Sequence, residues 1–265
     1  MGSNIPYLKI EEVSKHFPTP GGCLPVLEKI NLEIREGEFI CIVGPSGCGK
    51  TTLLNIIANL EAVTTGRILY KGKTLPVTGP DRLVIFQELG LFPWLTVQDN
   101  VEFGLKVKKT PSAKRKKIAD EYLRMVNLIK FKNFFIHELS GGMKQRVALA
   151  RALVMDPEIL LMDEPFAALD AQTRDLLHQE LQKIWSHTKK TILFVTHNVR
   201  EAACLGDRVI VFSAQPASVK ASFDINLPHP RQIESPGLMD IVRPIIEELK
   251  PEIEKITKIN HEESN

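Results

Sequence analysis

Long hydrophobic runs are missing from this chain of 265 residues. No apolar stretch approaches the ~18–20 residues that a membrane-spanning helix needs, and the first residues show no charged region followed by an apolar one. We therefore expect neither a membrane span nor a signal peptide. A large charge of one sign is also missing, and a net charge of +2 gives no general reason to expect a nucleic-acid-binding or a disordered acidic chain.

Cysteine is scarce, and internal repeats and low-complexity tracts are absent. Cys23, Cys41, Cys48 and Cys204 lack metal-ligand spacing, and two of them lie in or beside a glycine-rich loop where a disulfide would fit poorly. Reduced thiols in a cytosolic protein are the expected state. Cys48 could be reactive because a helix N-terminus favours thiolate, although a small filler residue is the simpler interpretation.

What is present includes one eight-residue string: Gly44, Pro45, Ser46, Gly47, Cys48, Gly49, Lys50 and Thr51. It fits G-x-x-x-x-G-K-[ST] at every fixed position, between an apolar run over 39–43 and a helical pattern over 52–57. Strand, glycine loop and helix are the context of a phosphate site, where backbone N–H groups surround phosphate oxygens. We expect Lys50 to reach the β- and γ-phosphates and Thr51 to help hold Mg²⁺, with Thr52 as a further nucleotide contact.

Two acidic residues, Asp163 and Glu164, follow the apolar run Ile159–Met162. In an open α/β sheet, ligands bind at the carboxyl ends of the strands, where these two side chains should emerge. We expect Asp163 to bind Mg²⁺, directly or through water, and Glu164 to orient or deprotonate the attacking water. A strand that ends in Asp-Glu is weak evidence alone, but together with the phosphate loop it predicts a nucleoside-triphosphatase.

The wider apolar pattern predicts an α/β fold with a mainly parallel sheet. Continuous apolar strands, separated by helical patterns, are expected at 39–43, 83–86, 159–162, 191–195 and 209–212.

Two other regions depart from this pattern. Alternating segments at 7–10 and 30–34 predict an N-terminal antiparallel β subdomain. Residues 88–139 show no clear strand but have helical spacing at 100–105 and 113–128, which indicates a helical insertion.

A third string, Leu139–Arg146, reads Leu-Ser-Gly-Gly-Met-Lys-Gln-Arg and resembles the signature motif of ATP-binding cassette (ABC) ATPases. Outside that family, Ser140 would simply be the N-cap of a helix. Four more residues match family motifs in the expected order: Phe17 (the aromatic that stacks on adenine), Gln87 (Q-loop), Asp170 (D-loop) and His197 (switch histidine). The plainer alternatives are a core position for Phe17, a polar strand end for Gln87 and a structural role for His197.

The resemblance covers at least residues 7–213, with small departures. Ala167 begins the D-loop where Ser is commoner, and Asn198 follows the switch histidine where Asp is frequent. The resemblance implies one ABC ATPase domain over 1–265. Its parts would be a core with the β subdomain (7–87 and 159–213), a helical signature subdomain (88–158) and a short tail (214–265).

The resemblance also implies a head-to-tail homodimer that hydrolyses ATP with Mg²⁺. Ser140, Gly141 and Gly142 would face the γ-phosphate of the ATP held by the other copy, and Asp170 would cross the interface. The implied catalytic residues are Glu164, His197 and Gln87, and the implied metal ligands are Thr51, Gln87 and Asp163.

Two further strings, Gln87–Val101 and Leu227–Arg231, resemble those in importers of nitrate, taurine, aliphatic sulfonates and related solutes. The implied partners are a second copy, two membrane-spanning permease subunits and, indirectly, a solute-binding protein, but no nucleic acid. The implied location is the cytoplasmic face of the cell membrane. The alternatives are an exporter, a system that extracts lipids or lipoproteins, a soluble ABC protein, and a P-loop kinase or GTPase, of which the signature string and His197 disfavour the last.

Three surface features leave alternatives open. Phe92, Trp94 and Leu95 form an apolar cluster that is either subdomain core or a groove for a partner helix. A basic run over 106–117 is either a solvated face or a contact with anionic lipid headgroups. A charged helix near 239–259 packs either on the cassette or on the partner copy.

Overall fold

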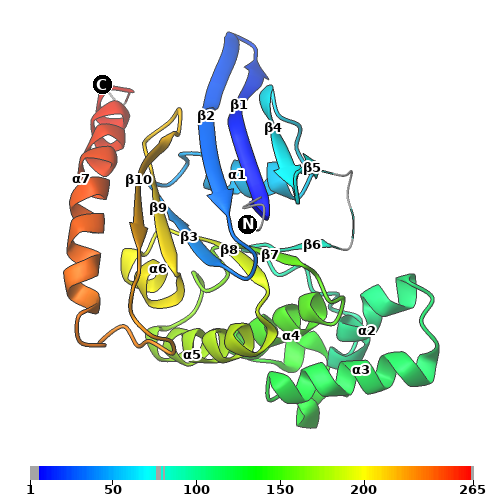
Figure 1. The fold of residues 1–265 in the computed structure, drawn as a ribbon. Helices are drawn as coiled ribbons and strands as arrows, with labels where there is room; N and C mark the ends of the chain where they lie inside the picture. The colour runs from blue at the N-terminus through cyan, green and yellow to red at the C-terminus, as the bar shows by residue number, and fades with distance from the viewer. Residues whose placement is uncertain (1–5, 76–78, 80, 264–265) are drawn as a thin grey trace, which may run out of the picture.

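Two β-sheets frame the molecule in a computed structural model that describes residues 6–75, 79 and 81–263 (Figure 1). The smaller sheet has the order β2-β1-β4-β5 and consists of β1 (Leu8–Thr19), β2 (Gly22–Ile34), β4 (Thr65–Tyr70) and β5 (Lys73–Thr74). The larger sheet has the order β10-β9-β3-β8-β7-β6 and consists of β3 (Phe39–Val43), β6 (Arg82–Ile85), β7 (Ile159–Asp163), β8 (Thr191–Thr196), β9 (Arg208–Phe212) and β10 (Val219–Asp224).

The larger sheet is the parallel core that the apolar runs predicted. Its strands β9, β3, β8, β7 and β6 pair in parallel, and every residue of β3, β7 and β8 is buried. Strands that are covered on both faces are continuously apolar rather than alternating, which is why the sequence pattern located them to within a residue or two. The smaller sheet is antiparallel, also as predicted.

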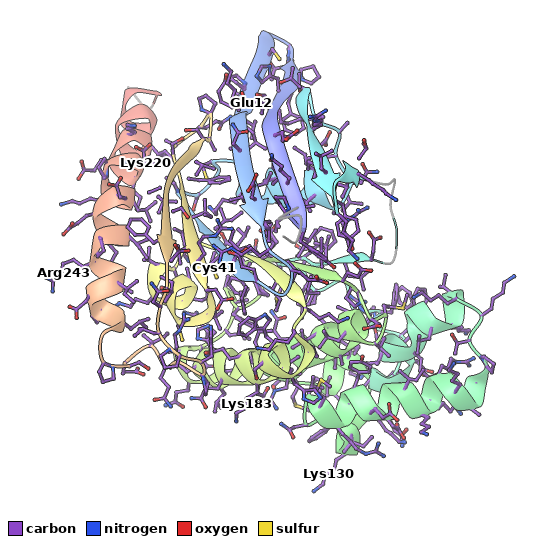
Figure 2. All side chains as sticks on the ribbon, viewed as in Figure 1. Glu12, Cys41, Lys130, Lys183, Lys220 and Arg243 are labelled. Carbon is purple, nitrogen blue, oxygen red and sulfur yellow. The ribbon has the colours of Figure 1, made fainter. Side chains whose placement is uncertain are left out.

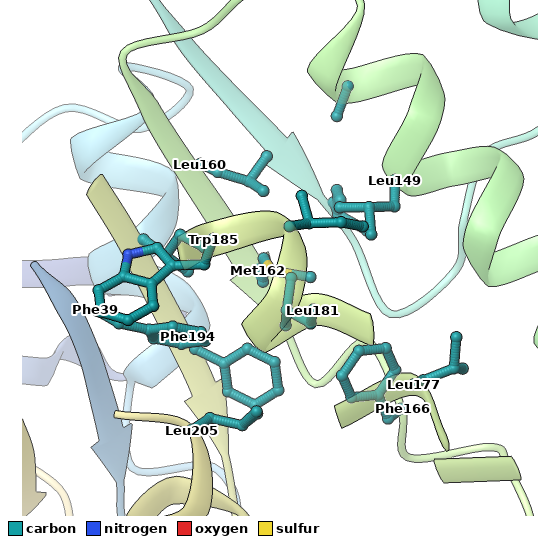
Figure 3. Packing of buried hydrophobic residues seen from close by; sticks show 14 of the residues in the cluster. Phe39, Leu149, Leu160, Met162, Phe166, Leu177, Leu181, Trp185, Phe194 and Leu205 are labelled. Carbon is teal, nitrogen blue, oxygen red and sulfur yellow. The ribbon is translucent and has the colours of Figure 1, made fainter. Parts of the chain in front are cut away.

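Side chains from the two faces of the parallel sheet enter different hydrophobic clusters. Along β3, Phe39 and Cys41 face a cluster that the helices α4 to α7 cover, whereas Ile40 and Ile42 face α1 and the antiparallel sheet. Figure 3 shows the first cluster, with Phe39, Trp185 and Phe194 packed together. The parallel sheet is therefore a middle layer that is covered on both faces.

The helices are α1 (Lys50–Ile57), α2 (Val97–Val107), α3 (Ser112–Met125), α4 (Gly141–Leu153), α5 (Ala171–Thr188), α6 (Val199–Leu205) and α7 (Leu238–Glu263), with short 3₁₀ turns at Ile129–Phe131 and Ile136–Glu138. The helices α2 and α3, together with the N-terminal part of α4, form the helical part at the lower right of Figure 1. The predicted segments 100–105 and 113–128 overlap α2 and α3. Residues 88–139 contain no strand, only an isolated bridge between Thr96 and Phe135.

The tail joins the sheet before it forms its helix. The sequence pattern did not indicate β10, which pairs antiparallel with β9 as an outer strand with no fully buried position. It also missed β4 and β5. The helix α7 then runs beside β10 (Figure 1), and Leu238, Val242, Ile245 and Leu249 bury one of its faces in the first cluster. No helix in the described part of the chain is long and apolar enough to cross a bilayer.

Candidate functional site

The glycine-rich string forms a tight loop between β3 and α1. Gly49, the N-cap of α1, has φ +115°, a conformation that residues with a side chain rarely adopt. A Cβ at this position would also lie 2.8 Å from Leu27 Cδ2 and 2.9 Å from Val26 Cγ1. The loop therefore lies directly against β2, and only glycine fits at its end.

Lys50 lies at the centre of this loop. Its side chain is buried, and Nζ donates hydrogen bonds to the carbonyl oxygens of Gly44 at 2.9 Å and Pro45 at 2.8 Å. An ammonium group has three donors, so one more remains for a ligand oxygen beside the loop. The lysine therefore both fixes the loop and supplies a positive charge next to the N-terminus of α1.

Asp163, the last residue of β7, connects the acidic strand end to the loop. The Thr51 hydroxyl donates a hydrogen bond to Asp163 Oδ1 at 3.1 Å. Burial raises the pKa of Asp163, the Thr51 hydrogen bond and the Lys50 charge oppose that change, and the neighbouring Glu164 adds to it. Because burial makes the Asp163 carboxylate costly to ionise, a cation bound beside it would stabilise the ionised form.

The loop and the acidic strand end share one cleft of about 400 Å³, within the range of small-ligand sites. The lining residues are Ser46, Gly47, Gly49, Lys50, Thr51, Thr52, Gln87, Asp163 and Glu164. The structure thus brings Gln87, which is exposed at the end of β6, to the same cleft as the phosphate loop.

Glu164 and His197 are paired at the edge of this cleft. His197 Nδ1 lies 2.9 Å from Glu164 Oε2, and the His197 side chain is 58% exposed. Glu164 has φ +43°, and such a left-handed conformation costs a non-glycine residue about 1–3 kcal/mol. Its N–H donates to Val195 O at 3.0 Å, which anchors the turn to β8. The strained backbone aims the Glu164 carboxylate away from the strand and toward His197.

Outside the signature and D-loop residues, four predicted nucleotide contacts do not line the cleft: Phe17, Gly44, Pro45 and Cys48. Phe17 is partly buried against the second hydrophobic cluster, and the Lys15 ammonium lies 4.6 Å from its ring centroid. Cys48 is fully buried, and burial raises the pKa of its thiol, which disfavours the reactive thiolate and favours the filler interpretation. All four cysteines are free thiols, as expected.

The predicted signature and D-loop residues begin two other helices. Ser140 caps α4 by accepting from the Met143 N–H at 3.3 Å, and Asp170 caps α5 by accepting from the Thr173 N–H at 2.9 Å. The Thr173 backbone hydrogen bond lowers the pKa of Asp170. A Cβ on Gly142 would lie 2.5 Å from Thr173 Cγ2, so the starts of α4 and α5 pack closely.

None of Ser140, Gly141, Gly142 and Asp170 lines the cleft at the phosphate loop. Within one chain, the structure therefore does not bring the signature residues to the cleft.

A buried polar network behind the cleft was not predicted. It contains His178 on α5, Glu201 on α6 and Thr196 at the end of β8. The sequence carries no pattern that would have identified it, because the three side chains meet only after α5 and α6 have packed on the sheet.

An exposed aromatic surface lies on the helical part. The Phe92 ring lies 4.5 Å from that of Phe103 and 5.6 Å from that of Trp94, which is 70% exposed. Asn100 is completely buried, and its side chain binds the backbone of Phe92 at 2.9 and 3.1 Å and of Thr96 at 3.0 Å. The loop is therefore held rigidly from below, with Trp94 on its outside.

The lysines of the basic run point to solvent. Lys106, Lys108, Lys109, Lys114, Lys116 and Lys117 are all exposed. Arg115 instead pairs with Glu102 at 2.7 Å. Exposed ammonium groups are what both a solvated face and a contact with anionic headgroups require.

The chain is similar to known proteins over most of its length. Residues 27–167 match the family model described as "ABC transporter". An uncharacterized ABC transporter ATP-binding protein of Methanocaldococcus jannaschii is 49% identical over 95% of this chain and 94% of its own length. A nitrate import ATP-binding protein of Synechocystis is 46% identical, covering 84% of each chain, and a bicarbonate transport ATP-binding protein of Synechococcus elongatus is 43% identical over 86% and 84%.

A solved structure shows the same fold. It is a dimeric post-hydrolysis state of an ATP-binding cassette bound to ADP and Pi, with a TM-score of 0.73 and 35% identity over 83% of this chain and 100% of the other.

Proposed function

The chain belongs to the ABC transporter family as an ATP-binding subunit with ATPase activity, and from this premise we propose that it powers solute uptake through separate membrane-spanning subunits. One observation carries the catalytic part of the proposal. The phosphate loop, Asp163 and Glu164 border a single cleft, with His197 paired to Glu164 at its edge.

The triphosphate of ATP is the ligand that this cleft fits best. The loop amides and the N-terminus of α1 would bind phosphate oxygens, and Lys50 would add the third donor of its ammonium group. Phe17, on β1, would contact the adenine.

The oxygen atoms at one end of the cleft suit Mg²⁺. Thr51 and Asp163 present hard oxygen donors that already lie 3.1 Å apart, and Gln87 lies at the same cleft. Magnesium usually combines one or two carboxylates with phosphate and water oxygens. Among the described residues, no group of three His, Cys, Asp or Glu side chains could hold a metal without such additional oxygens. When bound, Mg²⁺ would neutralise charge on the phosphate oxygens.

Glu164 would act as the general base toward the attacking water, and His197 would orient the Glu164 carboxylate. The 2.9 Å contact between them fixes the carboxylate at the edge of the cleft, where the terminal phosphate would lie. Gln87 would contact the same water from β6. These roles make Glu164, His197 and Gln87 the catalytic residues.

The dimer follows from the separation of the cleft and the signature residues. We propose that Ser140, Gly141 and Gly142 of one copy meet the γ-phosphate held by the other, with Asp170 at the seam. The parts of the chain would then act separately: 7–87 and 159–213 bind ATP, 88–158 carries the signature and contacts the permease, and 214–265 is a tail.

The direction and solute are inferred from relatives. Proteins named for nitrate import and bicarbonate transport are 46% and 43% identical to this chain. We infer import of small solutes of the nitrate, sulfonate and taurine type. The permease and an indirectly acting solute-binding protein would select the solute, and the chain would lie at the cytoplasmic face of the membrane.

The test uses Glu164→Gln in a complex reconstituted with its membrane subunits into vesicles that contain ATP, with the solute-binding protein added outside. We expect the variant to bind ATP but hydrolyse it at least ~10²-fold more slowly, because it lacks the general base. Uptake of external labelled nitrate, bicarbonate or taurine should stop with it.

The matched control is Glu121→Gln, an exposed glutamate on α3, which should hydrolyse and transport normally. Hydrolysis at the wild-type rate by Glu164→Gln would remove Glu164 from the catalytic role. Normal hydrolysis by the wild-type complex with outward movement of solute would contradict the importer, and normal hydrolysis without uptake of any of these solutes would contradict the inferred solute class.

A further inference from the structure

A second histidine lies behind the Glu164–His197 pair. His178 is on α5, is only 2% exposed, and touches neither the cleft nor a residue of the phosphate loop. A buried histidine often has no role beyond hydrogen bonding within the core, so a functional role for His178 depends on which residues it contacts.

On one side, His178 connects to the two residues that flank His197. Its Nε2 lies 2.7 Å from Glu201 Oε1, and the other oxygen of Glu201 accepts a hydrogen bond from the Thr196 hydroxyl. Thr196 Oγ1 in turn accepts from the Asn198 N–H at 3.0 Å. Because an ionised carboxylate only accepts, His178 must donate through Nε2.

The same chain of bonds also begins α6. The Asn198 side chain accepts from the N–H groups of Arg200 at 3.0 Å and Glu201 at 3.3 Å. Both neighbours of His197 are therefore tied to Glu201, and Glu201 is tied to α5 through His178.

On the other side, His178 packs against the turn that follows Glu164. Its ring meets that of Phe166 edge to face, with centroids 5.5 Å apart and planes at 61°. Phe166 is 4% exposed and lies against Leu177 at one end of the core cluster in Figure 3. His178 thus contacts the supports of both members of the pair, from a helix that begins at Asp170.

We propose that His178 is a positioning residue for ATP hydrolysis, which fixes His197 through Glu201 and Thr196, and Glu164 through Phe166. The inference rests on the catalytic roles proposed above and adds a residue to them. Without the His178 donor, Glu201 loses one of its two partners inside the protein, and the turn carrying His197 loses its connection to α5. Because α5 begins at the D-loop residue Asp170, His178 also links the proposed dimer seam to the catalytic pair.

The experiment measures ATP turnover and ATP affinity of the purified full-length chain with His178→Phe, which keeps a ring but has no donor. Misplaced catalytic groups should lower kcat by about 10- to 100-fold. The dissociation constant for ATP should stay within about twofold, because the phosphate loop is untouched. His178→Gln restores a donor toward Glu201 but lacks the ring that meets Phe166, so it should recover only part of the turnover. His187→Phe, an exposed histidine on the same helix, should behave as the wild type.

Wild-type kcat in His178→Phe would overturn the proposal, as would a loss confined to ATP affinity. If His178→Phe fails to fold by circular dichroism, His178→Leu, which also has no donor, replaces it and is judged by the same two outcomes. Glu164→Gln is measured in parallel. Full activity there would refute the catalytic role of Glu164, whereas an inactive Glu164→Gln beside a normal His178→Phe would refute only the positioning role.

Discussion

Glu252 shows how one side chain attaches α7 to the outer strand β10. It is 3% exposed, accepts from the Ala214 N–H at 2.9 Å, and lies 3.1 Å from the Lys220 ammonium and 2.9 Å from that of Lys255. Burial raises the pKa of Glu252, but the Ala214 hydrogen bond and the two lysines outweigh it and lower the pKa to about 2. Lys220 extends from β10 toward α7 (Figure 2), so the carboxylate joins strand and helix.

A pKa below its unfolded value makes Glu252 a source of stability that acid removes. Its contribution is complete above the unfolded pKa, near 4.5, and is lost as the pH falls toward 2. Glu252→Gln should lower the free energy of unfolding by about 1–3 kcal/mol at pH 7, and the difference from wild type should shrink from pH 4.5 to pH 3. Urea unfolding at pH 7, 4 and 3 measures this, with the exposed Glu254→Gln as control. A difference that stays constant with pH would contradict the assignment.

The phosphate-loop residues could be predicted because they are close together in the sequence. Gly49, Lys50 and Thr51 are adjacent in one loop, so their spacing alone predicts a phosphate site. His178 and Glu201 meet across 23 positions, between two helices that pack on the sheet. No periodicity encodes that meeting. The outer strand β10 was missed for a related reason, since its alternation of half-buried and exposed positions is much weaker than a continuous apolar run.

At the scale of elements, the loop that leads into α2 is a rigid platform rather than a flexible connection. The side chain of Asn100, on α2, hydrogen-bonds to the backbone of this loop. Arg151 on α4 donates to Leu89 O and Gly90 O, both at 2.6 Å. The Arg151 guanidinium also lies 5.8 Å from the Phe92 ring centroid. A rigid exposed aromatic has little entropy to lose on binding, which suits Trp94 as an anchor for a permease helix.

Trp94→Ala tests this platform. The ATPase activity of the isolated chain should be unchanged, because Trp94 does not border the cleft. The affinity for the detergent-solubilised membrane subunits should fall about tenfold or more, as for a buried aromatic anchor, in a titration by calorimetry. Leu60→Ala, which alters a 57% exposed apolar residue after α1, should bind normally. Equal affinities for Trp94→Ala and wild type would rule out Trp94 as the anchor.

At the scale of the whole molecule, the cleft and the predicted signature residues lie apart within one chain. The cleft has the phosphate loop and two acidic residues, with His197 at its edge, whereas Ser140 caps α4 elsewhere. The related cassette with 35% identity was solved as a dimer with ADP and Pi bound. Two copies related by a two-fold axis would make two equivalent sites, each built from the loop of one chain and the signature of the other.

Two inactive variants should therefore restore each other. Lys50→Ala removes the loop cation, and Ser140→Asp keeps the cap of α4 while placing a negative charge against the γ-phosphate. In a mixed dimer, one site combines both defects and the other has neither. An equimolar mixture should recover roughly a quarter of wild-type turnover, because about half the dimers are mixed and each has one intact site. Each variant alone, or mixed with itself, should stay inactive in the same ATPase assay. If the mixture is no more active than its components, either Ser140 acts within its own chain or hydrolysis needs two intact sites in one dimer. Either result would contradict two shared sites that hydrolyse ATP independently.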